Sequence, residues 1–160
     1  VGAQAISKAL MQNETLIQLD LGDNRIGDVG TKTISEALSK NSTLTGLNLG
    51  NNTIEDVGAQ AISEALVQNT TLIQVDLEDN GISDSLMSKI GLQVKRNKEK
   101  QASFESVKAS AKVLSILSQH QSGVFFSLPR ELNIKIASLT GNSKVDSEAR
   151  LTEIANSFFK

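Results

Sequence analysis

The stretch that decides the fold is "TLIQLDLGDNRIGDVGTKTISEALSKN", residues 15–41, because the chain repeats its pattern twice more. The second copy is "TLTGLNLGNNTIEDVGAQAISEALVQN" at 43–69, and the third begins at residue 71 with "TLIQVDLEDNGISD". Each copy starts 28 residues after the previous one and follows the frame L-x-x-L-x-L-x-x-N-x-I, with one valine among the leucines of the third copy. A fixed period of this length is typical of repeat proteins, in which each unit buries the face of its neighbour.

Each copy predicts a short strand followed by a helix. The strand is indicated by apolar residues at alternate positions, such as Leu47 and Leu49, which place one face of a strand in a core. The helix is indicated by Ile62, Ala65 and Leu66, which fall on one helical stripe. Neither element can bury its apolar face alone. We therefore predict that the strands form a curved parallel sheet and that the helices line its outer face.

Three further rows of polar residues recur with the same period, and we predict structural roles for them. The asparagine after each strand should hydrogen-bond backbone groups of the neighbouring turn. The aspartate near the start of each helix should cap the free N–H groups of that helix. The asparagine after each helix should close it in the left-handed conformation. These rows are Asn24, Asn52 and Asn80; Asp28, Asp56 and Asp84; and Asn13, Asn41, Asn69 and Asn97.

The repeated frame resembles leucine-rich repeats of the 28-residue, ribonuclease-inhibitor-like class, over residues 1 to about 97. The resemblance implies an α/β solenoid with parallel strands on the concave face and helices on the convex face. The opening "VGAQAISKAL" matches Val57–Leu66, so we predict that residues 1–97 are an N-terminally truncated array of three strand–helix units. Leu86 stands where the three earlier helices have glycine, and the frame does not recur after it.

The same resemblance implies a protein-binding module that contacts its partner through the concave strand face. Polar residues lie at and just after the strands, between the buried leucines, and include five acids and no base. A surface of one sign attracts partners of the opposite charge, which predicts a basic protein partner. The alternative is that these are ordinary solvated positions. The predicted contact residues are Gln18, Asp20, Asp23, Asn48, Asn51, Gln74, Asp76, Glu78 and Asp79.

Composition and missing motifs exclude several classes of function. The chain has no cysteine and one histidine, which excludes disulfides, thiolate metal sites and a cysteine nucleophile. Its net charge of −2 points to neither nucleic acid nor a membrane surface, and no stretch is apolar enough to span a bilayer. It has no calcium-loop pattern, phosphate-binding glycine loop or nucleophile elbow. We therefore predict a cytoplasmic, non-enzymatic binding protein without metal or cofactor.

The segment after the array is predicted to be a small all-helical element, residues 98–160. "KRNKEKQAS", residues 95–103, carries five charges in six positions, which predicts a helix end or a hinge. The next stretch, "SFESVKASAKVLSILSQHQ", is amphipathic and could cap the open end of the array. Pro129 suits the first turn of a later helix.

"LPRELNIKIASL", residues 128–139, resembles the opening of an F-box, L-P-x-E-L-x-x-x-I. The resemblance implies a helix that docks in the groove of a Skp-type adaptor of ubiquitin ligases. The alternative is a helical cap that buries the same residues. Repeats followed by such a motif also resemble virulence effectors that bacteria secrete into a host cytosol, which would make the chain a substrate receptor for a host ligase. The matching residues are Leu128, Pro129, Glu131, Leu132 and Ile136.

Overall fold

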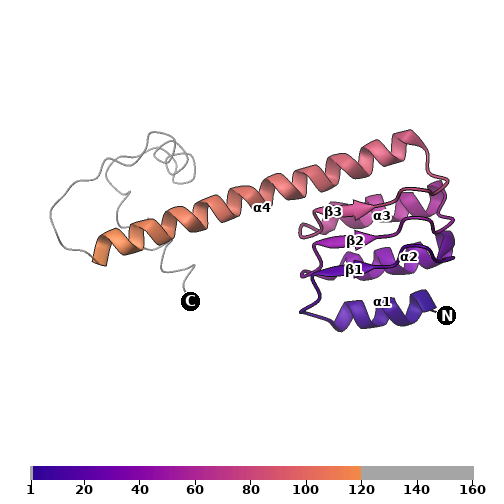
Figure 1. Ribbon diagram of the computed structural model, residues 1–160, viewed down its shortest axis with the longest axis horizontal. Coiled ribbons are helices and arrows are strands. Elements are labelled where there is room, and N and C mark those ends of the chain that lie inside the picture. The colour runs from indigo at the N-terminus through magenta and orange to yellow at the C-terminus, as the bar shows by residue number, and fades with distance from the viewer. Residues whose placement is uncertain (1, 120–160) are drawn as a thin grey trace. The chain divides into compact units, whose positions relative to one another are not determined.

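The structure is a computed structural model that describes residues 2–119, and the side chains of residues 2–109. Helices and short strands alternate along the described chain (Figure 1). The elements are α1 (Gly2–Gln12), β1 (Gln18–Asp20), α2 (Gly27–Leu38), β2 (Gly46–Asn48), α3 (Asp56–Gln68), β3 (Gln74–Asp76) and α4 (Asp84–Gln119). The chain divides into two units between Gln101 and Ala102, and all three strands belong to the first.

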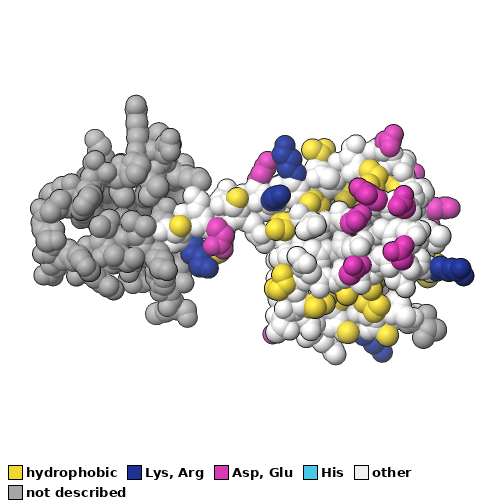
Figure 2. All heavy atoms as spheres, in the orientation of Figure 1, with side chains coloured by type: hydrophobic (Ala, Val, Ile, Leu, Met, Phe, Trp, Pro, Cys, Tyr) yellow, Lys and Arg dark blue, Asp and Glu magenta, His cyan; other side chains and the backbone are white. Residues whose placement is uncertain are grey.

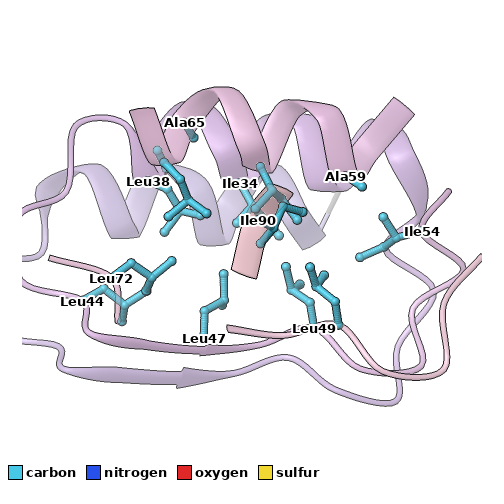
Figure 3. Packing of buried hydrophobic residues seen from close by; sticks show 14 of the residues in the cluster. Ile34, Leu38, Leu44, Leu47, Leu49, Ile54, Ala59, Ala65, Leu72 and Ile90 are labelled. Atoms are coloured by element: carbon cyan, nitrogen blue, oxygen red, sulfur yellow. The ribbon is translucent and has the colours of Figure 1, made fainter. Parts of the chain in front are cut away.

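The three strands form one parallel sheet in the order β1-β2-β3. Leu19 pairs with Leu47, and Leu47 pairs with Val75, so residues 28 positions apart lie side by side. Helices α2 and α3 pack together on one side of this sheet (Figure 3). The predicted solenoid of parallel strands and helices is therefore confirmed.

The core lies between the sheet and the helices, and it is built from the repeated leucines. Leu44, Leu47 and Leu49 of the second unit are each no more than 2% exposed. They face Ile34 and Leu38 of α2, which are fully buried (Figure 3). Burying each side chain of this kind contributes about 1.5–3 kcal/mol. The stacking of units therefore supplies the stability that one unit lacks.

The asparagines after the strands form the predicted ladder between units. Asn52 Nδ2 donates to Leu21 O at 2.8 Å, and its Oδ1 accepts from Ile26 N at 3.2 Å. Asn80 Nδ2 donates in the same way to Leu49 O at 3.0 Å. Each side chain thus satisfies backbone groups of the preceding unit, and this prediction is confirmed.

The asparagines near the helix ends form a second ladder, but not for the predicted reason. Asn69 has φ −74° and ψ 125°, which is extended and not left-handed. Its Nδ2 donates to Leu38 O at 2.8 Å and to Asn41 O at 2.9 Å, while its Oδ1 accepts from Leu72 N. The side chain therefore ties the end of one helix to the end of the previous one. The prediction of a left-handed helix end was wrong.

The aspartates cap helices, but Asp28 and Asp56 serve the following unit. Helix α2 begins at Gly27, before Asp28, and no side chain caps its N-terminus. Asp28 Oδ1 instead accepts from Glu55 N at 2.8 Å and from Gly58 N at 3.0 Å, at the start of α3. Asp56 Oδ1 accepts from Ser83 N at 2.7 Å, just before α4. The prediction that each acid caps its own helix was wrong for these two positions.

Helix α4 is continuous for 36 residues, through the charged segment 95–103. Lysine, arginine and glutamate are good helix formers, and neither glycine nor proline occurs from Leu92 to Gln119. The predicted helix end was therefore wrong for this segment, whereas a hinge stays a prediction, since the two units divide within it between Gln101 and Ala102. Asn97 lies within the helix, fully buried, and its Nδ2 donates to Asn69 O at 2.9 Å. The first part of α4 thus completes the second asparagine ladder.

Candidate protein-binding face

Register places the predicted contact residues in rows across the strands. Asp20 pairs with Asn48, and Asn48 pairs with Asp76. Gln18 and Gln74 pair in the same way with Gly46, which lies between them. Neighbouring strands are about 4.8 Å apart, so each row is a short line of polar groups. We call this surface the strand face, defined by the nine predicted contact residues: Gln18, Asp20, Asp23, Asn48, Asn51, Gln74, Asp76, Glu78 and Asp79.

The first row is held in place by one repeated hydrogen bond. Asp20 Oδ1 accepts from Gly22 N at 2.9 Å, and Asn48 Oδ1 accepts from Gly50 N at 2.8 Å. Asp76 Oδ1 accepts from the N–H two residues later, also at 2.9 Å. Each short side chain therefore folds over the turn after its strand, which fixes its orientation. An aspartate and an asparagine are interchangeable in this bond, because both provide the accepting oxygen.

A second row follows the strands and has left-handed backbone conformations. Asp23, Asn51 and Asp79 have φ of 56°, 52° and 54°. Asp and Asn are the non-glycine residues that adopt this conformation most readily. Asn51 Nδ2 donates to Asp23 Oδ1 at 2.8 Å, which joins two units across the exposed face. This position is left-handed in all three units, whereas sequence analysis had placed left-handed residues at the helix ends.

Glycines in the first two units lie in close contact with polar side chains of this face, a feature that sequence analysis missed. A Cβ on Gly46 would lie 3.3 Å from Gln18 Cγ, so the Gln18 side chain lies over the middle strand. A Cβ on Gly22 would lie 2.9 Å from Asn48 Nδ2. A side chain at Gly22 would therefore displace the central asparagine. In the sequence, this close contact is indicated by a glycine at a position where a side chain would point away from the core.

The acids of the strand face have no basic partner in the part of the chain that the structure describes. Acidic side chains gather over the strand side of the array (Figure 2). Among residues 2–109, the one ion pair joins Lys108 Nζ to Glu105 Oε1 at 4.0 Å, in α4. Five carboxylates of this surface therefore have no ion-pair partner among residues 2–109. The five are Asp20, Asp23, Asp76, Glu78 and Asp79.

Within the described residues, no group of three His, Asp or Glu side chains is placed to hold a metal ion. In the same part of the chain, no helix combines the length and the apolar character needed to cross a membrane. The residues of the F-box-like motif lie outside the described residues, so that motif stays a prediction. They are Leu128, Pro129, Glu131, Leu132 and Ile136.

A family model described as Leucine Rich repeat matches residues 12–35, 40–63 and 68–91, each window spanning one strand and the helix start that follows it. The chain contains three leucine-rich repeats. This agrees with the 28-residue frame and with the strand–helix order of the structure.

Two solved structures are similar to this chain. A structure of leiomodin-1 actin-binding site 2 has a TM-score of 0.50 and 23% sequence identity, and the match covers 74% of this chain and 80% of that one. The tropomodulin C-terminal domain of Caenorhabditis elegans has a TM-score of 0.51 and 15% identity, covering 99% of this chain and 98% of that one. At these identities the similarity concerns the fold. No curated protein sequence matches the chain.

Proposed function

We propose that the chain is a protein-binding scaffold whose strand face holds a basic segment of a partner protein. The observation that carries this proposal is the pair of rows in which acids flank a central asparagine. Asp20 and Asp76 lie on either side of Asn48, and Asp23 and Asp79 occupy equivalent positions around Asn51. Leucine-rich repeats offer extended surfaces of this kind to other proteins.

The spacing of the acids suits a partner with several separate lysines or arginines. Asp20 and Asp76 lie on strands two positions apart in the sheet, about 10 Å from each other. Each carboxylate has one oxygen in a turn hydrogen bond, and the other oxygen has no bonded partner among the described residues. Each exposed pair adds about 0.2–1 kcal/mol, so several pairs are needed for affinity. Their shared sign also speeds association with a basic partner.

Neutralising two acids of the strand face tests the proposal, and the asparagine at the equivalent position of the second unit indicates which substitution to use. Asp20→Asn and Asp76→Asn remove two charges, while Asn48 shows that asparagine makes the same turn hydrogen bond. The matched control is Glu36→Gln with Glu64→Gln, on exposed positions of α2 and α3, which pack on the opposite side of the sheet. Both double variants have the same net charge, so any difference between them reports the position of the charge.

The probe is a display library of unstructured peptides of unrestricted sequence, selected on the wild-type chain. We expect the selected peptides to be rich in lysine and arginine, and their affinity to fall as salt is raised. We expect about tenfold weaker binding to the strand-face variant and unchanged binding to the helix variant. Selection of neutral or acidic peptides would refute the proposal, as would equal losses in both variants.

The F-box-like motif supports a second proposal, in which the repeats select a substrate for a ubiquitin ligase. In this alternative a bacterium secretes the protein into a host cytosol; in the first, the protein acts in the cytoplasm. The supporting observation is the L-P-x-E-L-x-x-x-I match at 128–136. A pull-down with a purified Skp-type adaptor tests it, beside a Leu132→Asp, Ile136→Asp variant with an unchanged circular dichroism spectrum. The absence of adaptor binding by the wild-type chain would refute it.

A further inference from the structure

Asn97 differs from the other asparagines of its row in the pairing of one buried atom. Asn97 is fully buried, and its Oδ1 is one of two buried side-chain polar atoms that have no hydrogen-bond partner within the described residues. Its Nδ2 is satisfied, because it donates to Asn69 O at 2.9 Å and to Leu72 O at 3.0 Å. A buried acceptor without a donor is destabilising, and native structures contain few of them. The rest of the row identifies the donors that Asn97 lacks.

The three earlier asparagines of this row accept from the same two backbone donors. Asn41 Oδ1 accepts from Thr43 N at 3.1 Å and from Leu44 N at 2.8 Å, two and three residues later. Asn13 and Asn69 accept from the N–H groups at the same two offsets. In all three cases the helix has ended before the asparagine, and the residues after it are not helical. These two bonds therefore depend on an interruption of the helix.

After Asn97 the helix continues, and this removes the two donors. The equivalent N–H groups are those of Glu99 and Lys100, which lie inside α4 (Figure 1). In an α-helix such groups donate to the carbonyl four residues earlier, so they are not available to Asn97 Oδ1. The unpaired oxygen is thus a consequence of helix continuity. An interruption of the helix after Asn97 restores both donors.

The part of α4 that precedes Asn97 has the length and the charge of a complete helix of the array. The interval from the start of α4 to Asn97 equals the interval from the start of α3 to Asn69. Lys95 and Arg96 immediately precede the asparagine. Positive side chains in the last turn of a helix interact favourably with the helix dipole. An interruption after Asn97 therefore places both cations where they stabilise the preceding helix.

Like charges oppose the continuity of the helix in the same segment. Arg96 and Lys100 are four residues apart, and Lys95 and Lys98 are three apart, so each pair lies on one face of the continuous helix. All four side chains are exposed. Like charges at these spacings destabilise a helix, and Glu99, four residues after Lys95, offsets only part of the repulsion. The helix is therefore weakened where the unpaired oxygen of Asn97 favours an interruption.

We propose that α4 contains a hinge at Asn97, with two states in equilibrium. The major state is the continuous helix of the described structure, and in the minor state the helix is interrupted after Asn97. In the minor state Asn97 Oδ1 accepts from the N–H groups of Glu99 and Lys100, as its counterparts do in the earlier units. The chain after this point then leaves the array in another direction. The hinge lies just before the boundary between the two units, at Gln101 and Ala102.

The distance between two spin labels, measured by double electron–electron resonance on the full chain, distinguishes the two states. The chain has no cysteine, so introduced cysteines are labelled specifically. The test pair is Glu64→Cys in α3 with Ala109→Cys in α4, and the control pair is Glu64→Cys with Lys89→Cys, ahead of the hinge; all three positions are exposed. We expect two distance populations for the test pair and one for the control pair. Raising the salt concentration should reduce the second population, because it screens the like-charge repulsion.

Two sets of substitutions shift the equilibrium in opposite directions. Lys98→Ser, Glu99→Thr and Lys100→Leu copy the turn "NSTL" at 41–44, and should make the minor distance the major one. Lys98→Ala with Lys100→Ala removes both like-charge pairs and keeps good helix formers, so the ratio of minor to major state should fall about two- to fivefold. The control pair should keep its wild-type distance in both variants, which shows that the array is folded. The proposal is overturned if the test pair gives one population in the wild type at low salt, or if either set of substitutions leaves the ratio unchanged.

Discussion

Asp28 in helix α2 accepts a hydrogen bond from the backbone N–H of Gly58 in helix α3, at 3.0 Å. Thirty residues separate the two, yet the contact recreates a helix cap across the boundary between units. The same carboxylate oxygen accepts from Glu55 N at 2.8 Å. A free N–H at a helix start needs such an acceptor, and here the neighbouring unit provides it. Stacking and capping are therefore coupled in this array.

Replacing Asp28 should weaken the junction between the first two repeats. We expect Asp28→Ala to lower the free energy of unfolding by about 1 kcal/mol, because Glu55 N and Gly58 N lose their acceptor. Asp28→Asn keeps the accepting oxygen and should cost much less. Urea denaturation of the two variants and the wild type measures the difference. Equal effects of alanine and asparagine would show that charge, rather than the hydrogen bond, stabilises the junction.

Two helical glycines should respond to alanine in opposite directions. A Cβ on Gly58 would lie 2.7 Å from Asp28 Oδ1 and 3.2 Å from Asp28 Cα, so Gly58→Ala must push the two units apart. We expect it to cost about 1–3 kcal/mol. Gly91, in α4, is exposed and has nothing within 4 Å of an added Cβ. Gly91→Ala should stabilise the chain by about 0.5–1 kcal/mol through helix propensity.

Thermal unfolding of the two glycine variants, compared with the wild type, tests this pair of expectations. A neutral Gly58→Ala would mean that the units separate without cost, contrary to the close contact with Asp28.

The two asparagines that open the first ladder should differ in their contribution to stability. Asn52 is fully buried and bonds backbone groups of its own unit and of the unit before it; Leu21 O and Ile26 N belong to the earlier unit. Asn52→Ala leaves these groups without a partner, so we expect a loss of about 2–4 kcal/mol. Asn24 occupies the same frame position but is exposed and bonds only its own turn. Asn24→Ala should cost less than about 1 kcal/mol.

Chemical denaturation of both variants, with the wild type beside them, measures the contrast between Asn24 and Asn52. If the two substitutions cost the same, the bonds between units contribute nothing beyond the local turn.

The parts of the fold that depend on the repeat period could be predicted from the sequence. Leu47 and Leu49 recur at fixed spacing, so their burial and the parallel register follow once units are stacked in order. The same register brings Asp20 and Asp76 onto one face, as alternation along a strand predicts. Periodicity therefore predicted both the core and the rows of the candidate site.

Contacts that depend on the offset between units could not be predicted in this way. Asp28 precedes most of its own helix, so sequence spacing alone assigned it to that helix. The offset of neighbouring units, which only the folded array defines, brings it to Gly58 instead. The segment around Asn97 is as highly charged as a solvated loop. Its residues are nevertheless good helix formers, and no further repeat follows that would end helix α4. Local charge was therefore a poor indicator of where α4 ends.

The continuity of α4 through this charged segment can be tested with a helix breaker. Lys100 is exposed and lies inside the helix, so its side chain contributes little to packing. Lys100→Pro removes a backbone donor and clashes with the preceding turn, at a cost of about 3 kcal/mol or more in a helix interior. We expect a loss of helical circular dichroism signal in the proline variant, whereas Lys100→Ala keeps the wild-type spectrum. Unchanged helicity in the proline variant would place a break in the helix at this position, as the charge pattern alone had predicted.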